Sequence, residues 1–198
     1  LDLPVLGALN AKYYPKIDGT KNADNASSAS ANDNVGNGSS ISLKTNLGDL
    51  PVLGGFLDGA TLTSGYSTHE EAVTANTDDA HELTAALNYS IGALSLGYQE
   101  KYNNAGQTTE AGQTNFYRDT VIGAAYAVND NLSISYNRYD SYRHGHSTTN
   151  PEQTTDAVNI GYTMGGMTIG FQDASTDNAN YTTATKDDTR TLGISVAF

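Results

Sequence analysis

Large apolar and small or polar residues alternate along most of this chain. In residues 191–198, Leu192, Ile194, Val196 and Phe198 alternate with Thr191, Gly193, Ser195 and Ala197. This period of two places successive side chains on opposite faces of a β-strand. The same alternation recurs in residues 82–91, 94–99, 158–164 and 167–172, and less regularly in residues 5–14, 39–47, 56–67, 115–128 and 131–142. Because no apolar period of 3.6 persists, the pattern predicts about ten strands and no helix.

The connections between these strands alternate in length. Residues 92–93, 128–131 and 165–166 form short turns that are rich in Gly, Asn and Asp. The others are long and polar, and they comprise residues 17–38, 68–79, 103–114, 143–153 and 175–187. A meander with one trimmed rim and one rim of long loops is typical of bacterial outer-membrane barrels.

The sequence DLPVLG occurs twice, at Asp2–Gly7 and at Asp49–Gly54. We expect both copies at the short-turn rim, where Pro4 and Pro51 would cost few ladder hydrogen bonds at the start of a strand. Two interpretations stay open: a ten-strand barrel uses one turn motif twice, or the chain begins at a turn of a longer protein.

The composition limits the classes of function. Hydrophobic residues make up 37% and charged residues 16% of the chain, and Cys and Trp are absent, which excludes disulfides and thiolate metal sites. The net charge of −12, without a basic cluster, excludes nucleic acid as a partner and favours cations. No apolar run approaches the ~18 residues of a transmembrane helix. The first residues also lack the features of a signal peptide.

Thirteen tyrosines suit an environment that is apolar at one end of the side chain and wet at the other. We predict two aromatic girdles, as found at the two membrane interfaces of a barrel. The girdle near the short turns comprises Tyr89, Tyr126, Tyr162 and Phe198, and the girdle near the long loops comprises Tyr66, Tyr102, Tyr142 and Phe171.

The terminal sequence DDTRTLGISVAF resembles the assembly signal of outer-membrane β-barrels. In that family the barrel-assembly machinery reads the last strand, which here carries Leu192, Ile194, Val196 and Phe198. Together with LNYSIGALSLGYQEKY and VNIGYTMGGMTIGFQDAS, this region is similar to Gram-negative general porins of the α-proteobacterial kind. The resemblance covers residues 80–198 well and residues 1–79 loosely.

The resemblance implies a transmembrane antiparallel up-and-down β-barrel in the bacterial outer membrane, in contact with lipid and lipopolysaccharide and assembled as a homotrimer. Such porins have about sixteen strands and an inward-folded constriction loop. This chain has material for about ten strands, and its longest loop, residues 17–38, reads as exposed. Residues 1–198 are therefore either a single small barrel domain or the C-terminal portion of a longer porin.

The inward positions of the alternation predict the function. Gly, Ala, Ser and Thr dominate them, which leaves room for water and favours a channel for passive diffusion of small hydrophilic solutes and ions. A structural or adhesive barrel with a filled interior is the alternative, and a secreted β-protein is a third. The polar residues expected to line the lumen are Lys44, Glu82, Asn88, Gln99, Lys101, Asn159 and Gln172.

Specific metal or catalytic chemistry is not expected. His144 and His146 flank one residue but lack a third ligand at fixed spacing. The loop acids Asp18, Asp24, Asp33, Asp78, Asp79, Asp187 and Asp188 lack the spacing of a calcium loop, so we expect no cofactor and at most loosely bound Ca²⁺. The pairs Asp140 with His144 and Asp79 with His81 have no catalytic motif around them, so we predict that the protein is not an enzyme.

Overall fold

The structure is a computed structural model that describes residues 2–3, 6–15, 37–51, 55–70, 79–104, 114–145 and 150–197. The predictions for Phe198, for His146, for Asp18, Asp24, Asp33 and Asp78, and for nearly all of the 17–38 loop fall outside these residues.

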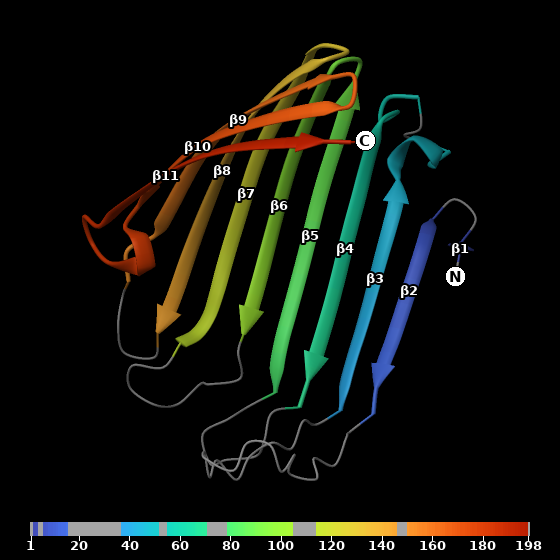
Figure 1. Cartoon of the computed structure of the whole chain (residues 1–198). Coiled ribbons are helices and arrows are strands. Elements are labelled where there is room, and N and C mark those ends of the chain that lie inside the picture. Colours follow the sequence, from blue (N-terminus) through green and yellow to red (C-terminus); the bar gives the residue numbers. More distant parts are fainter. Residues whose placement is uncertain are drawn as a thin grey trace, which may run out of the picture.

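The described chain forms one antiparallel sheet of eleven strands in sequence order (Figure 1). The first strand has only two residues, so the ten full strands that the alternation predicts are present. The strands are β1 (Asp2–Leu3), β2 (Gly7–Tyr14), β3 (Gly38–Asn46), β4 (Ala60–His69), β5 (Ala80–Ile91), β6 (Leu94–Asn104), β7 (Thr114–Asn129), β8 (Leu132–Gly145), β9 (Gln153–Met164), β10 (Met167–Asp177) and β11 (Lys186–Val196). The predicted all-β, up-and-down architecture is thus confirmed.

The sheet is strongly curved but open. Its edges are β1 with β2 at one side and β11 at the other, and the strand order does not join them. Closure into a barrel therefore stays a prediction.

Several strands extend beyond the residues whose alternation predicts them. β9 begins at Gln153 rather than near Val158, and β10 continues to Asp177 rather than ending near Gln172. In these added segments both faces carry mainly polar residues, so the ladder hydrogen bonds continue where the apolar alternation has ended.

The short turns lie at one rim of the sheet. In the β5–β6 and β9–β10 hairpins the first turn residue is a glycine with positive φ, 56° at Gly92 and 59° at Gly165, a conformation that other residues adopt at a cost. In the β7–β8 turn the side-chain oxygen of Asn129 accepts hydrogen bonds of 2.9 Å from the amides of Asn131 and Leu132.

The described residues of both copies of DLPVLG lie at this rim, whereas Pro4, Val5 and residues 52–54 fall outside the described part of the chain. The first joins β1 to β2 tightly, with Leu3 opposite Gly7. The second begins in the short 3₁₀ turn η2 (Leu47–Asp49) and belongs to the longer connection that leads into β4. Identical sequences therefore serve connections of different length.

No second layer covers the sheet within the described residues. Their buried hydrophobic residues are three alanines, Ala60, Ala80 and Ala179. None of the described helical segments is long and apolar enough to cross a membrane. The two faces of the sheet are therefore the surfaces on which function has to be sought.

Candidate functional site

Strand pairing gives the sheet one polar and one apolar face. On β5 the polar face carries Glu82 and Asn88, and the apolar face carries Leu83, Leu87 and Ile91. All seven residues predicted to line a lumen fall on the polar face, because cross-strand partners share a face. Whether this face encloses a lumen stays a prediction.

The apolar face consists of large side chains that are exposed. Leu192 and Ile194 of β11 are 66% and 63% exposed, and comparable residues occur on every strand from β4 to β10. The seven described members of the two predicted girdles also lie on this face, as the pairings show: Tyr66, Tyr89, Tyr102, Tyr126, Tyr142, Tyr162 and Phe171. An apolar surface of this extent indicates contact with something other than water.

The loop-side limit of the apolar residues crosses the strands obliquely. On β5 the last apolar residue toward the loops is Leu83, and on β11 it is Leu192. Leu192 lies in a cross-strand row that passes through Phe171, Ile160, Ile134, Tyr126 and Leu94 and reaches β5 at Ile91. On β5 this row lies at Ile91, eight residues nearer the turns than the limit at Leu83. The limit therefore moves by eight residues over the six strand spacings between β5 and β11.

The slope of this limit follows from standard sheet dimensions. Eight residues at ~3.4 Å each span about 27 Å along the strands, and six spacings of ~4.8 Å span about 29 Å across them. Between β5 and β11 the limit is therefore inclined on average by about 43° to the cross-strand direction, within the strand tilt of roughly 35–45° of transmembrane barrels. From β3 to β5 it is level, because Ile41, Tyr66 and Leu83 share one row.

The tyrosines nearest the turns follow a similar line. The cross-strand row of Tyr126 meets β5 at Ile91, and Tyr89 lies two residues from it toward the loops. The same row meets β9 at Ile160, and Tyr162 lies two residues from it toward the turns. Two residues per two strand spacings correspond to a slope of about 35°. The three tyrosines thus lie on a straight line across the tilted strands.

Phe171 does not lie where the sequence predicts it. It was expected near the loop end of its strand, but it occupies the middle of β10, in the same row as Tyr126. The reason is that β10 continues for six residues beyond it, to Asp177. Tyr66, Tyr102 and Tyr142, by contrast, share one row near the loop ends.

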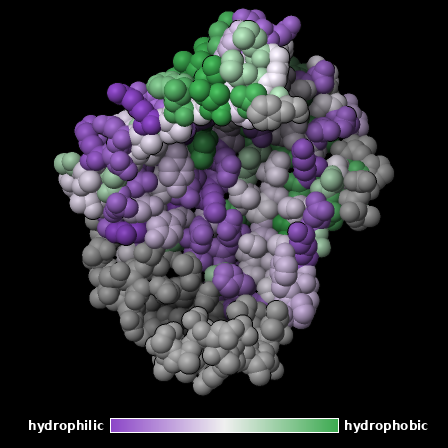
Figure 2. Space-filling view, in the orientation of Figure 1, coloured by the Kyte–Doolittle hydropathy of each residue, from purple (hydrophilic) through white to green (hydrophobic). Residues whose placement is uncertain are grey.

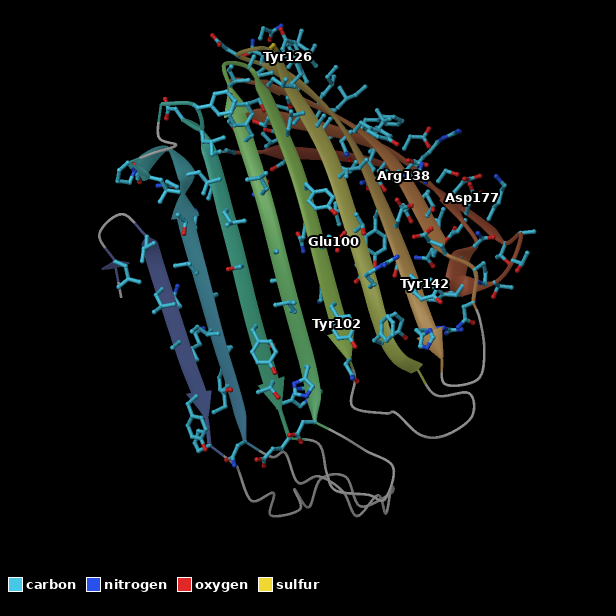
Figure 3. The ribbon with its side chains drawn as sticks, turned by 180° about the vertical axis from the view of Figure 1, so that it is seen from behind. Glu100, Tyr102, Tyr126, Arg138, Tyr142 and Asp177 are labelled. Atoms are coloured by element: carbon cyan, nitrogen blue, oxygen red, sulfur yellow. The ribbon has the colours of Figure 1, made fainter. Side chains whose placement is uncertain are left out.

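Polar groups border the apolar residues on the loop side. Tyr98 donates a hydrogen bond of 2.5 Å to Glu100, and Tyr136 donates one to Asp156. Arg138 pairs with Asp140, and Arg190 pairs with Asp173, each at 3.0 Å. Figure 3 shows Glu100 and Arg138 between Tyr126 at the turn side and the ends of the strands where Tyr102 and Tyr142 lie. Tyrosines with apolar rings and hydrogen-bonded hydroxyls are typical of an interface between hydrocarbon and water.

Aromatic rings gather beyond this polar border, on β6, β7 and β8. The ring of Phe116 lies 5.0 Å from that of Tyr102 and 4.9 Å from that of His144, and the Arg118 guanidinium lies 5.9 Å from the ring centre of Tyr142. His144, weighed above as a metal ligand, is thus part of an aromatic stack.

Most charges of the polar face lie in its loop half, and Lys44, near the turn end of β3, is an exception. In its loop half, Lys101 and Glu82 form an ion pair of 3.1 Å. Toward the turns this face carries small or neutral residues on neighbouring strands, such as Ser95, Ser135 and Thr163. Figure 2 shows hydrophilic residues gathered in the hollow of the sheet and hydrophobic residues over the upper edge, where β10 and β11 lie.

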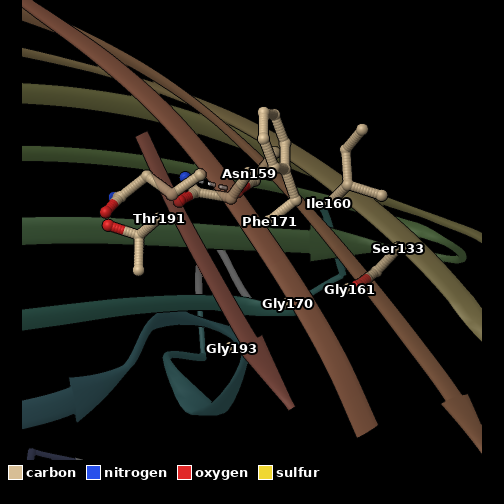
Figure 4. A pocket seen from close by; sticks show the side chains of 10 residues that line it. Ser133, Asn159, Ile160, Gly161, Gly170, Phe171, Thr191 and Gly193 are labelled. Carbon is tan, nitrogen blue, oxygen red and sulfur yellow. Dashed lines mark hydrogen bonds between the residues drawn. The ribbon is translucent and has the colours of Figure 1, made fainter. Parts of the chain in front are cut away.

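A shallow groove of about 440 Å³ lies on the polar face of β8 to β11 (Figure 4). Asn159 and Gln172, both predicted to line the lumen, are opposite each other there. Gly161, Gly170 and Gly193 form one cross-strand row in its floor, and a Cβ atom at Gly170 would meet no neighbour within 4 Å. Absence of side chains, rather than packing around a ligand, creates this space.

The described residues offer little for metal binding or catalysis. They contain no group of three or more His, Cys, Asp or Glu residues that could hold a metal ion. Asp140 bonds to Arg138 and to Thr154, at 2.7 Å, and His81 bonds to Tyr66 at 2.8 Å.

One cluster on the polar face was missed by the sequence prediction. It joins Tyr117 and Asp119 of β7, Ser141 and Arg143 of β8, and Tyr181 of the β10–β11 link. The alternation places the strand residues on the polar face, but it contains no signal that the link folds onto them.

No protein-family model matches this chain, and no curated protein matches its sequence.

Proposed function

We propose that this chain forms the wall of a water-filled channel in a bacterial outer membrane, through which small hydrophilic solutes and ions diffuse passively. The observation that carries the proposal is the oblique apolar limit on one face of the sheet. A flat membrane boundary crosses strands tilted by about 40° along such a line. Neither a soluble sheet nor a fibre requires an oblique limit of its apolar residues.

The chemistry of the apolar face supports this proposal. Exposed Leu, Ile, Val and Tyr side chains are stable in hydrocarbon, and the sheet pairs its own backbone groups, as a membrane requires. The tyrosine hydroxyls that reach Glu100 and Asp156 place polar groups where headgroups would begin. Outer-membrane lipid and lipopolysaccharide are the proposed surroundings.

The polar face supports a passage rather than a filled interior. A filled barrel packs its inside with side chains, whereas the turn half of this face is lined by Gly, Ala, Ser, Thr and Asn. The groove over Gly161, Gly170 and Gly193 is open for the same reason. A channel also requires both sheet edges to be paired, either β2 with β11 or each with further strands.

The partners follow from the resemblance to general porins. The barrel-assembly machinery would read Leu192, Ile194 and Val196 of β11 together with Phe198, and the assembled protein would be a homotrimer. Neither a resident cofactor nor nucleic acid has a place in this function, and Ca²⁺ would bridge acidic loops to lipopolysaccharide without a dedicated site.

The test is ion conductance of the purified protein in planar bilayers under a KCl gradient. We expect stepwise conductance and a cation preference that fades from low to molar salt, because the net charge of −12 acts as a screened field over the mouth. The polar face itself holds both signs, with Lys12, Lys44, Lys101 and Arg143 against Glu82, Asp119 and Asp187.

Two other results would have distinct meanings. A cation preference unchanged by salt, or an anion preference, would assign selectivity to this charged belt of the polar face rather than to the loop field. Absence of conductance from correctly inserted protein would contradict the channel and favour the structural or adhesive barrel.

A further inference from the structure

The link between β10 and β11, residues 178–185, folds onto the polar face of the sheet. It contains the short 3₁₀ turn η3 (Ala179–Tyr181). The Asn180 amide donates a hydrogen bond of 2.9 Å to the side-chain oxygen of Gln153, which lies on the polar face of β9. The Asn178 side chain donates another of 2.9 Å to the carbonyl of Glu152. The link is thereby attached to β9, a strand that does not directly precede or follow it.

Tyr181 extends the attachment to β7 and β8. Its hydroxyl lies 2.8 Å from the hydroxyl of Ser141, which donates a hydrogen bond of 2.6 Å to Asp119. Because Ser141 has one hydroxyl hydrogen and gives it to Asp119, Tyr181 is the donor to Ser141. Ser141 is fully buried, at 0% exposure. The chain of bonds therefore ends on a carboxylate, which strengthens it relative to neutral pairs.

The Tyr181 ring contacts two neighbouring residues of the sheet. The Arg143 guanidinium lies 4.8 Å from its centre, and the ring of Tyr117 lies 5.9 Å away. Arg143 is itself fixed, because it donates a bond of 3.0 Å to the side chain of Asn150 and its carbonyl accepts one of 3.2 Å from the same side chain. The ring thus has a cation–π contact with a guanidinium that is already positioned.

The backbone of the link adopts a conformation that needs such support. Four residues that are not glycine have positive φ, namely Asn178 at 52°, Asn180 at 54°, Tyr181 at 56° and Ala184 at 61°. Left-handed backbone is unfavourable for Tyr and Ala in particular, and it persists only where the surroundings fix it. The hydrogen bonds from Asn180 and Tyr181 to the strands provide that constraint.

We propose that residues 178–185 are a fixed constriction of the channel, and that Tyr181 is the positioning residue that latches it to the wall. This inference rests on the proposed function. The link lies at the level of the charged residues of the polar face. Tyr181 is connected through Ser141 to Asp119, and Asp119 lies directly opposite Lys101 in the β6–β7 ladder. Solutes that traverse the channel then pass between the link and the remainder of the belt, where both size and charge are selected.

The test is single-channel conductance of the intact protein in planar bilayers. We expect Tyr181→Ala to raise the conductance roughly 1.5-fold or more, because the released link leaves the cross-section of the channel. Tyr181→Phe keeps the ring contacts and loses only the bond to Ser141, so a smaller increase is expected. Thr183→Ala is the matched control, since Thr183 is an exposed residue of the same link.

A second readout does not depend on conduction. Hydrogen exchange of the Asn180 amide should accelerate at least tenfold in Tyr181→Ala, and Thr183→Ala should leave it unchanged. If the wild-type protein conducts but both Tyr181 variants conduct and exchange like it, the constriction is contradicted and the channel stands. If the inserted wild-type protein does not conduct, the proposed function fails and the constriction fails with it.

Alkaline pH gives a third comparison. Burial raises the pKa of the Tyr181 phenol above its ordinary value of 10.0, so the neutral, donating form is complete below that pH and is lost as pH rises through the raised pKa. The charged and titratable groups packed against it are Tyr117, Asp119, Tyr139 and Arg143. Wild-type conductance should therefore rise at alkaline pH, and Tyr181→Phe should lack the part of this rise that Tyr181 causes. Equal rises in both proteins would contradict a latch that depends on this hydroxyl.

Discussion

β5 and β11 are strands of nearly equal length in one sheet, with 12 and 11 residues, yet their apolar faces differ. On β5 the large residues extend from Leu83 to Ile91, almost the whole strand. On β11 they begin only at Leu192, and the three preceding positions of the same face are Lys186, Asp188 and Arg190. Leu87 and Asp188 even share one cross-strand row.

The difference teaches that position along a strand does not decide the environment of a residue. On the proposed function, depth below a flat membrane boundary decides it, because tilted strands would reach that boundary at different residues. An apolar face covered by a partner protein gives no reason for a limit whose average slope from β5 to β11 equals the strand tilt of membrane barrels.

The largest effect should come from a charge placed at the centre of the apolar residues of β5. Leu87→Lys should reduce the free energy of unfolding from vesicles by about 2–4 kcal/mol, because the ammonium loses its hydration in hydrocarbon. Asp188→Lys, in the same row, should change it by less than about 1 kcal/mol. Denaturant titrations of the refolded variants measure both, and equal losses would remove the distinction between the two strands.

The end of β11 should matter more for assembly than for stability. Deletion of Phe198 should lower the amount of assembled protein in cells roughly tenfold, as the resemblance to outer-membrane barrels implies, while refolding in detergent loses about 1 kcal/mol or less. Leu192→Ala provides a control that truncates an apolar side chain of the same strand and keeps the terminal residue. Similar losses in both assays would leave no case for an assembly signal.

The smallest effect is expected at the polar border itself. Tyr136→Phe removes the hydrogen bond to Asp156 and should cost less than about 1 kcal/mol, since water or headgroups replace the partner. Tyr126→Phe, nearer the turns, is the comparison. If Tyr136→Phe cost several times more than this, its hydroxyl would be buried in a protein interface rather than at a membrane boundary.

Sequence alone predicted most of the fold because the signal for a strand is local. The alternation from Thr191 to Val196 and the glycines at 92 and 165 locate β11 and two hairpins without knowledge of any partner. The position of Phe171 along its strand was mispredicted because β10 continues for six residues beyond it, in a segment without apolar alternation. The contact of Tyr181 with Ser141 joins residues 40 positions apart, and no periodicity encodes it.

The central claim is that the apolar limit marks a flat membrane boundary across tilted strands, and a depth scan tests it most directly. Single spin labels would be placed on the apolar face of β5 at positions 83, 87 and 91 and of β11 at positions 188, 192 and 194, and their accessibility to oxygen and to a water-soluble nickel complex compared in vesicles. The account predicts equal depth for labels at 83 and 192, with 87 and 194 in hydrocarbon and 188 in water. Equal accessibility for 87 and 188, which share a row, or water exposure of both 87 and 194, would contradict it.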